Sequence, residues 1–190
     1  MESPPDDPAW TALLAARDGG PASGPLAPLF APVLAPALAA DGCRVVGRLA
    51  QTLDGRIATA SGSSQWIGGP GDIRHTHRLR ALCHAVVVGA GTVRHDDPRL
   101  TTREVPGPNP VRVVIDTDRR LTTEYGLFRG GPPTLLVCAP DSAGGDRHGT
   151  AEVLRIPREA SGGIAPGALL RQLAARGLTR IFVEGGGLTV

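Results

Sequence analysis

From residue 44 onward, short apolar runs alternate along the chain with amphipathic segments. The apolar runs predict strands at 44–50, 85–88, 111–115, 134–138, 153–156 and 181–183. Between them, helical periodicity predicts one helix from Gly71 or Asp72 to about Cys83 and a second over 165–176. Continuous apolar strands that alternate with helices are typical of a parallel sheet covered on both faces. The pattern therefore predicts an α/β fold.

Residues 1–40 follow a different pattern and hold eight of the eighteen prolines. Prolines at every fourth position from Pro28 argue against a regular helix there, because proline lacks the N–H that a helix needs. A short helix is expected over 8–17, where Trp10 packs within the segment. We expect 1–40 to form a loosely docked Pro/Ala-rich extension and 41–190 to form the main domain.

Small and polar residues follow several of the predicted strands. Gly89-Ala-Gly91-Thr92 follows one strand, Asp116-Thr117 follows another, and Glu184 with three glycines follows the last. Ligands of open α/β sheets bind beyond the carboxyl ends of the strands, and glycine lets a ligand approach the backbone closely. A ligand role is favoured at Glu184 and its glycines. A tight turn explains Gly89–Gly91 equally well.

Charge and composition exclude several classes of function. The net charge of +2 is carried by arginine, since the chain has no lysine, and it is too small for a nucleic-acid-binding face. The three cysteines form no CxxC or Cys/His cluster, so neither a zinc site nor a disulfide scaffold is expected. No apolar run reaches the ~20 residues of a membrane span, and the acidic N-terminus is unlike a secretory signal. A cytoplasmic protein without membrane partners is expected.

The helix predicted to end near Cys83 carries several basic side chains. His75 and His77 are two positions apart and lie on different helix faces, so a shared metal is not expected. Arg80, close to the next strand, is the candidate for a ligand contact. Asp96 and Asp97, before a proline, fit either a solvated turn or a carboxylate at the lip of a cleft.

Four segments together resemble the reductase domain of bacterial riboflavin biosynthesis proteins, which belongs to the dihydrofolate-reductase-like superfamily. They are LAQTLDGRIATASGSSQWI (49–67), HRLRALCHAVVVGAGTVRHDDPRLTTR (77–103), NPVRVVID (109–116) and RIFVEGGG (180–187). The resemblance implies a three-layer fold with a mostly parallel central sheet. It also implies NADPH-dependent reduction of the ribosyl group of 5-amino-6-(5-phosphoribosylamino)uracil to a ribityl chain, with hydride passing to the anomeric carbon.

The resemblance assigns roles to residues that match the family's motifs. It implies that Asp96 acts in catalysis as general acid/base or as the group that orients it. The implied cofactor-binding residues are Ala50, Trp66, Thr92, Asp96, Thr117, Gly186 and Gly187, with Arg119 as a helper near the adenosine 2′-phosphate. The implied substrate-binding residues are Ser64, Arg80, Leu100, Arg103 and Glu184.

Two departures from the family pattern affect these expectations. The sequence stops at Val190, within the expected cofactor loop, so the sheet is expected to be cut short and its C-terminal strands, which support a homodimer in the family, to be missing. The zinc-deaminase signature of many relatives, H-x-E with a later P-C-x-x-C, is absent, so a stand-alone reductase domain without metal is expected. Two alternatives remain open: a reductase of another small substrate, and a non-catalytic ligand-binding or partner-binding paralogue.

Overall fold

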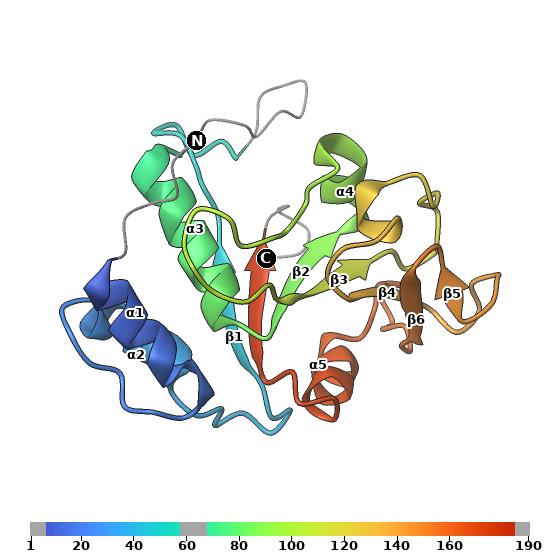
Figure 1. The fold of residues 1–190 in the computed structure, drawn as a ribbon. Coiled ribbons are helices and arrows are strands. Elements are labelled where there is room, and N and C mark those ends of the chain that lie inside the picture. The colour runs from blue at the N-terminus through green and yellow to red at the C-terminus, as the bar shows by residue number, and fades with distance from the viewer. Residues whose placement is uncertain (1–6, 58–67, 185–190) are drawn as a thin grey trace.

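The computed structural model describes residues 7–57 and 68–184, which form a seven-stranded sheet in the order β1-β7-β2-β3-β4-β6-β5 (Figure 1). All neighbouring strands are parallel except β5, which is antiparallel to β6. The strand bounds are β1 Arg44–Arg48, β2 Ala85–Gly89, β3 Val111–Ile115, β4 Thr134–Cys138, β5 Arg147–His148, β6 Ala151–Arg155 and β7 Arg180–Glu184. The predicted α/β fold with a mostly parallel sheet is confirmed. The two-residue strand β5 is too short to leave a pattern in the sequence.

Five α-helices accompany these strands in the described part of the chain. Their bounds are α1 Pro8–Ala15, α2 Ala27–Leu34, α3 Pro70–Leu82, α4 Ala90–Asp96 and α5 Pro166–Ala174, with 3₁₀ turns at Ala16–Asp18 and Gly126–Phe128. α3 begins on Pro70, directly after Gly69 at the N-cap, because the missing N–H of proline costs no hydrogen bond in the first turn. Both main predicted helices are confirmed within a few residues.

The sheet separates two hydrophobic clusters, which gives the fold three layers. One cluster contains Leu79 and Leu82 of α3 together with the side chains of β2 that point to that face. The other contains Leu169 and Leu173 of α5. The central strand β2 is wholly apolar because its side chains are buried on both faces.

The N-terminal segment packs tightly against the rest of the molecule, so the expectation of a loosely docked extension is wrong. The Trp10 side chain is 1% exposed, and its indole N–H donates to the carbonyl of Pro106 at 2.8 Å. The Arg17 guanidinium donates to the carbonyl of Ala81 at the end of α3, at 2.9 Å. Figure 1 shows α1 and α2 beside α3, at the opposite end of the molecule from β5 and β6.

The expectation that prolines prevent a helix after Pro28 is also wrong, since α2 contains both Pro28 and Pro32. Pro28 lies in the first turn, where a backbone nitrogen has no hydrogen-bond acceptor within the helix, so the missing N–H costs nothing. Pro32 removes one internal hydrogen bond from a helix of two turns. Burial of Phe30, which is fully enclosed and packs edge-on against Trp10, offsets that loss.

Arginine takes structural roles inside this lysine-free chain. Arg112 on β3 is buried, and its Nη2 donates to the carbonyls of Leu127, Gly130 and Pro132, while its Nε donates to the hydroxyl of Thr134. Burial lowers the pKa of Arg112. Within residues 7–57 and 68–184, no helix has the length and apolar character to cross a membrane.

Candidate active site

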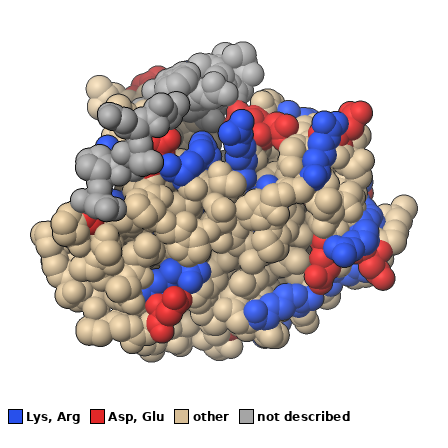
Figure 2. All heavy atoms as spheres, viewed as in Figure 1, with Lys and Arg blue, Asp and Glu red and all other residues tan. Residues whose placement is uncertain are grey.

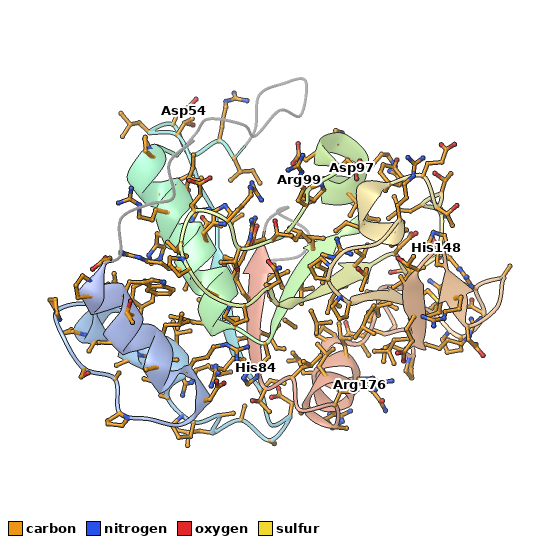
Figure 3. All side chains as sticks on the ribbon, viewed as in Figure 1. Asp54, His84, Asp97, Arg99, His148 and Arg176 are labelled. Carbon is orange, nitrogen blue, oxygen red and sulfur yellow. The ribbon has the colours of Figure 1, made fainter. Side chains whose placement is uncertain are left out.

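The site is built where the parallel strands β2, β3 and β7 end. Gly89 of β2 pairs with Ile115 of β3, and β2 also pairs with β7, so the carboxyl ends of all three strands lie at one edge of the sheet. Helix α4 rises from the end of β2 at this edge, and the loop after it returns over the sheet toward β3 (Figure 1). Asp97 and Arg99 in this loop lie at the same edge, whereas His84 lies at the opposite one (Figure 3).

An ion pair joins two of the predicted site residues. Arg80 of α3 donates from Nε and Nη2 to the two carboxylate oxygens of Glu184, at the end of β7, each at 2.6 Å. The side chains are 10% and 15% exposed, so solvent screens the pair little. The Nη1 of Arg80 also donates to the carbonyl of Thr101 at 3.0 Å. Arg80 therefore fixes the Glu184 carboxylate at the strand end and holds the loop above it.

Arg103 presents a freer positive charge beside this pair. It is an exposed residue, and its Nη1 contacts the Thr101 hydroxyl at 3.2 Å. Partial burial and the neighbouring charges of Arg80 and Arg99 lower the pKa of Arg103, which remains cationic at neutral pH. Figure 2, viewed as in Figure 1, shows basic side chains next to acidic ones along the upper part of the molecule. The arginine cluster is suited to a phosphate, which guanidinium groups bind in a bidentate manner.

His77 is a residue of this site that the sequence reasoning missed, since it weighed that histidine only as a metal ligand. The side chain is 1% exposed, and its Nδ1 accepts the backbone N–H of Arg103 at 3.0 Å. Burial and then the charges of Arg80 and Arg103 lower the pKa of His77 to about 4. The only sequence signal for this role is its spacing of three from Arg80, which places both on one helix face.

The two neighbouring carboxylates after α4 have different roles. Asp97 takes a left-handed conformation with φ of 37°, ends α4, and accepts the backbone N–H of Gly126 at 2.9 Å. Asp96, the last residue of α4, is half-buried, and within the described ranges its carboxylate makes no hydrogen bond. Asp97 is therefore a structural carboxylate, whereas the Asp96 carboxylate holds no group of the described ranges in place.

The end of β3 carries the residues expected near the adenosine part of the cofactor. The Asp116 carboxylate is buried and accepts the backbone N–H of Leu121 at 2.8 Å, so it stabilises a turn. Thr117 is half-buried beside it.

Arg119 does not present a free guanidinium at this point of the sheet. It donates to the carbonyls of Ala143, Gly145 and Arg147 at 3.1, 2.7 and 2.5 Å. The role that the resemblance gave Arg119 is therefore at odds with its contacts, because three carbonyls already hold its side chain. Arg120, with a side chain 73% exposed, is the more available cation and pairs with Asp118 at 2.8 Å.

The other expected site residues are placed in different ways. Ser64, Trp66, Gly186 and Gly187 lie outside the described residues. Ala50, just after β1, and Thr92, on α4, are half-buried. The Leu100 side chain is only 1% exposed and packs in the core, on a backbone with φ of 52°. Among residues 7–57 and 68–184, no three His, Cys, Asp or Glu side chains are grouped to hold a metal ion.

The polar groups at this edge fit a nicotinamide dinucleotide. Thr92 and Thr117 carry hydroxyls that form no hydrogen bond with another side chain or backbone group of the described ranges. Among the described residues, a Cβ added at Gly91 would meet no heavy atom within 4 Å.

Comparison with known proteins places this geometry in a family. A 2,5-diamino-6-ribosylamino-4(3H)-pyrimidinone 5′-phosphate reductase of Methanothermobacter thermautotrophicus is 40% identical over 148 residues, which are 75% of this chain and 67% of that protein. The riboflavin biosynthesis protein RibD of Escherichia coli is 34% identical over 152 residues, covering 73% of this chain and 41% of that protein. The chain thus spans about two thirds of the archaeal relative and less than half of the bacterial one.

Solved structures show the same fold. The deaminase/5-amino-6-(5-phosphoribosylamino)uracil reductase of Thermotoga maritima superposes with a TM-score of 0.63 at 32% identity, over 76% of this chain and 39% of that one. The riboflavin biosynthesis reductase Rib7 of Saccharomyces cerevisiae, at 22% identity, shares the fold with a TM-score of 0.66 over 88% of this chain and 74% of that one. The sequence-family model of the RibD C-terminal domain matches residues 44–190. With the dihydrofolate-reductase-like sheet and the arginine–carboxylate pair at its carboxyl edge, this chain belongs to the RibD C-terminal domain family.

Proposed function

We propose that this protein is an NADPH-dependent reductase of riboflavin biosynthesis that converts the ribosyl group of 5-amino-6-(5-phosphoribosylamino)uracil to a ribityl chain. Membership in the family supports a reductase of this pathway. The observation that carries the proposal is the Glu184 carboxylate fixed by Arg80, with the exposed Arg103 beside it. A carboxylate for the N–H groups of a pyrimidine and a cation for a sugar phosphate are thus close together.

Each residue of the site has a separate task in this mechanism. Arg103 binds the 5′-phosphate of the substrate, and Glu184 accepts hydrogen bonds from the pyrimidine ring. Arg80 holds the Glu184 carboxylate in one orientation through its two 2.6 Å bonds, which avoids an ordering cost when substrate binds. Bound NADPH supplies the hydride. Asp96 supplies the proton that the opening of the sugar ring requires at its ring oxygen.

NADPH is proposed over NADH because of the charges after β3. The Asp116 carboxylate, which would attract a ribose hydroxyl if it were exposed, is buried and accepts the backbone N–H of Leu121. Arg120 is exposed and Thr117 offers a hydroxyl, and both suit the 2′-phosphate that distinguishes NADPH.

Replacing Arg120 with glutamine tests the cofactor proposal. We expect the Kd for NADPH to rise about tenfold, because one charge-assisted contact to the 2′-phosphate is lost. The Kd for NADH serves as the internal control and should change less than twofold. Fluorescence titration of both cofactors measures the ratio, and an equal loss for both would remove Arg120 from the 2′-phosphate site.

Replacing Arg103 with alanine tests the substrate proposal. Loss of the phosphate contact should cost about 1.5–3 kcal/mol in substrate binding, seen as a rise in KM of roughly 10- to 150-fold. The Kd for NADPH should stay unchanged. Arg171→Ala, which removes an exposed arginine from α5, is the matched control and should leave the KM unaltered. A similar loss of affinity for both ligands in Arg103→Ala would refute the assignment.

A second substrate is favoured by the identity with the archaeal relative, whose name specifies the 2,5-diamino pyrimidinone. The two compounds carry the same phosphoribosyl group, so the arginine cluster does not separate them. Steady-state rates of NADPH oxidation with each compound decide: the physiological substrate has the larger kcat/KM. If the folded protein binds NADPH but oxidises it with neither compound, the proposed function is refuted.

Location and assembly follow from the proposal. We propose a cytoplasmic location, because the biosynthetic role and the free, buried thiols of Cys43, Cys83 and Cys138 suit a reducing compartment. The homodimer stays a prediction that light scattering of the purified chain can check.

A further inference from the structure

The loop between α4 and β3 carries Arg103 and has an unusual backbone. Asp97 and Leu100 both have positive φ, 37° and 52°, a region that side chains other than glycine rarely occupy. For a buried leucine this conformation is strained, and it persists only where the surrounding contacts determine it. The contacts that hold this loop therefore decide where Arg103 lies.

Two side chains of α3 hold the loop at neighbouring residues. Arg80 donates from Nη1 to the carbonyl of Thr101 at 3.0 Å, and His77 accepts the N–H of Arg103 at Nδ1, also at 3.0 Å. The loop then turns back, with the Thr102 N–H donating to the side chain of Asn109 at 2.7 Å. Among the described residues, His77 is thus the one whose side chain bonds directly to the backbone of Arg103.

The surroundings of His77 keep this bond available at neutral pH. A protonated imidazole has no acceptor nitrogen, so the bond to the Arg103 N–H requires the neutral ring. Burial in the core and the positive charges of Arg80 and Arg103 lower the pKa of His77 to about 4. At pH 7 the ring is neutral and its Nδ1 lone pair remains on the Arg103 N–H.

His75, two residues earlier, provides the contrast on the same helix. Its ring stacks on Phe30 of α2 at 5.3 Å between centroids, and it is half-buried. It therefore packs against the N-terminal segment instead of contacting the loop. The two histidines have similar chemistry and positions on separate faces of α3.

We propose that His77 is a positioning residue for substrate binding: its Nδ1 fixes the backbone of Arg103 so that the guanidinium lies ready for the substrate phosphate. The inference rests on the proposed function for its kinetic consequence. The structural half, that His77 orders the loop, stands on the contacts alone.

Two variants of His77 separate the hydrogen bond from packing. In His77→Asn the side-chain oxygen takes the place of Nδ1 and keeps an acceptor for the Arg103 N–H. In His77→Phe a ring of similar size fills the space but offers no acceptor. His75→Asn is the control for a histidine change elsewhere on α3. Hydrogen exchange of the peptide covering 99–105 and the kinetic constants are measured on all three full-length proteins.

We expect His77→Phe to exchange faster in 99–105 and to raise the KM for the substrate about tenfold, the effect of one lost hydrogen bond. Its kcat and its Kd for NADPH should stay within twofold of wild type. His77→Asn should restore slow exchange and most of the KM, and His75→Asn should match wild type in both.

Three results would overturn the inference. One is unchanged exchange in His77→Phe, and another is faster exchange without a rise in KM. The third is an equal loss in the Phe and Asn variants, which would indicate packing alone. If His77→Phe does not fold, failure of His77→Asn to keep the wild-type KM overturns it. A wild-type protein that binds no substrate refutes the proposed function instead, while exchange in 99–105 still tests whether His77 orders the loop.

Discussion

Replacing Glu184 with glutamine will lower both the stability of the protein and its affinity for substrate. Glutamine keeps the shape and one acceptor oxygen but leaves the charge of Arg80 without a counterion in a site where that side chain is 10% exposed. Breaking a buried pair in this way should cost about 3 kcal/mol of unfolding free energy. Substrate affinity should fall at least tenfold, because the pyrimidine loses a charged acceptor. Urea denaturation and the substrate KM measure the two effects.

A double variant separates the two roles of this pair. Arg80→Met with Glu184→Gln leaves no unpaired charge, so at least half of the lost stability should return. The affinity should not return, since the acceptor for the pyrimidine is still missing. If the double variant is as unstable as the sum of the single ones, the cost lies in packing and the ion-pair interpretation fails.

Replacing Asp96 with asparagine should reduce kcat by roughly 10²- to 10⁴-fold, the usual contribution of a positioned proton donor. The substrate KM and the melting temperature should change little, because the Asp96 carboxylate holds no described neighbour in place. Single-turnover rates at saturating NADPH measure the chemical step directly. An unchanged rate would remove Asp96 from catalysis.

The neighbouring carboxylate supplies a matched control for this experiment. In Asp97→Asn the side-chain oxygen still accepts the Gly126 N–H, and asparagine tolerates the left-handed backbone with φ of 37°. The kcat of Asp97→Asn should therefore stay within a few-fold of wild type. A loss equal to that of Asp96→Asn would mean that both variants disturb α4, and the assignment of the proton donor would fall.

The sequence by itself determined the framework of this protein. A strand that is buried on both faces is apolar along its length. The apolar runs therefore predicted Ala85–Gly89 and Thr134–Cys138 as central strands of a parallel sheet. Parallel strands end at a common edge, which pointed to the residues after β2, β3 and β7. The role-bearing residues, Asp96, Arg103 and Glu184 among them, came from the resemblance of several motifs in order.

The tertiary structure alone decided how these residues are connected. Arg80 and Glu184 are 104 positions apart in sequence, and His77 and Arg103 are 26 apart, so no local pattern records that they bond. The same holds for Trp10, whose contact with Pro106 makes the N-terminal segment part of the core. Local propensity also misjudged the proline-rich helix α2, because burial of Phe30 outweighs the one hydrogen bond that Pro32 removes. Such contacts depend on which surfaces the folded sheet brings together. Local periodicity does not predict them, because it reports only on residues that are close in sequence.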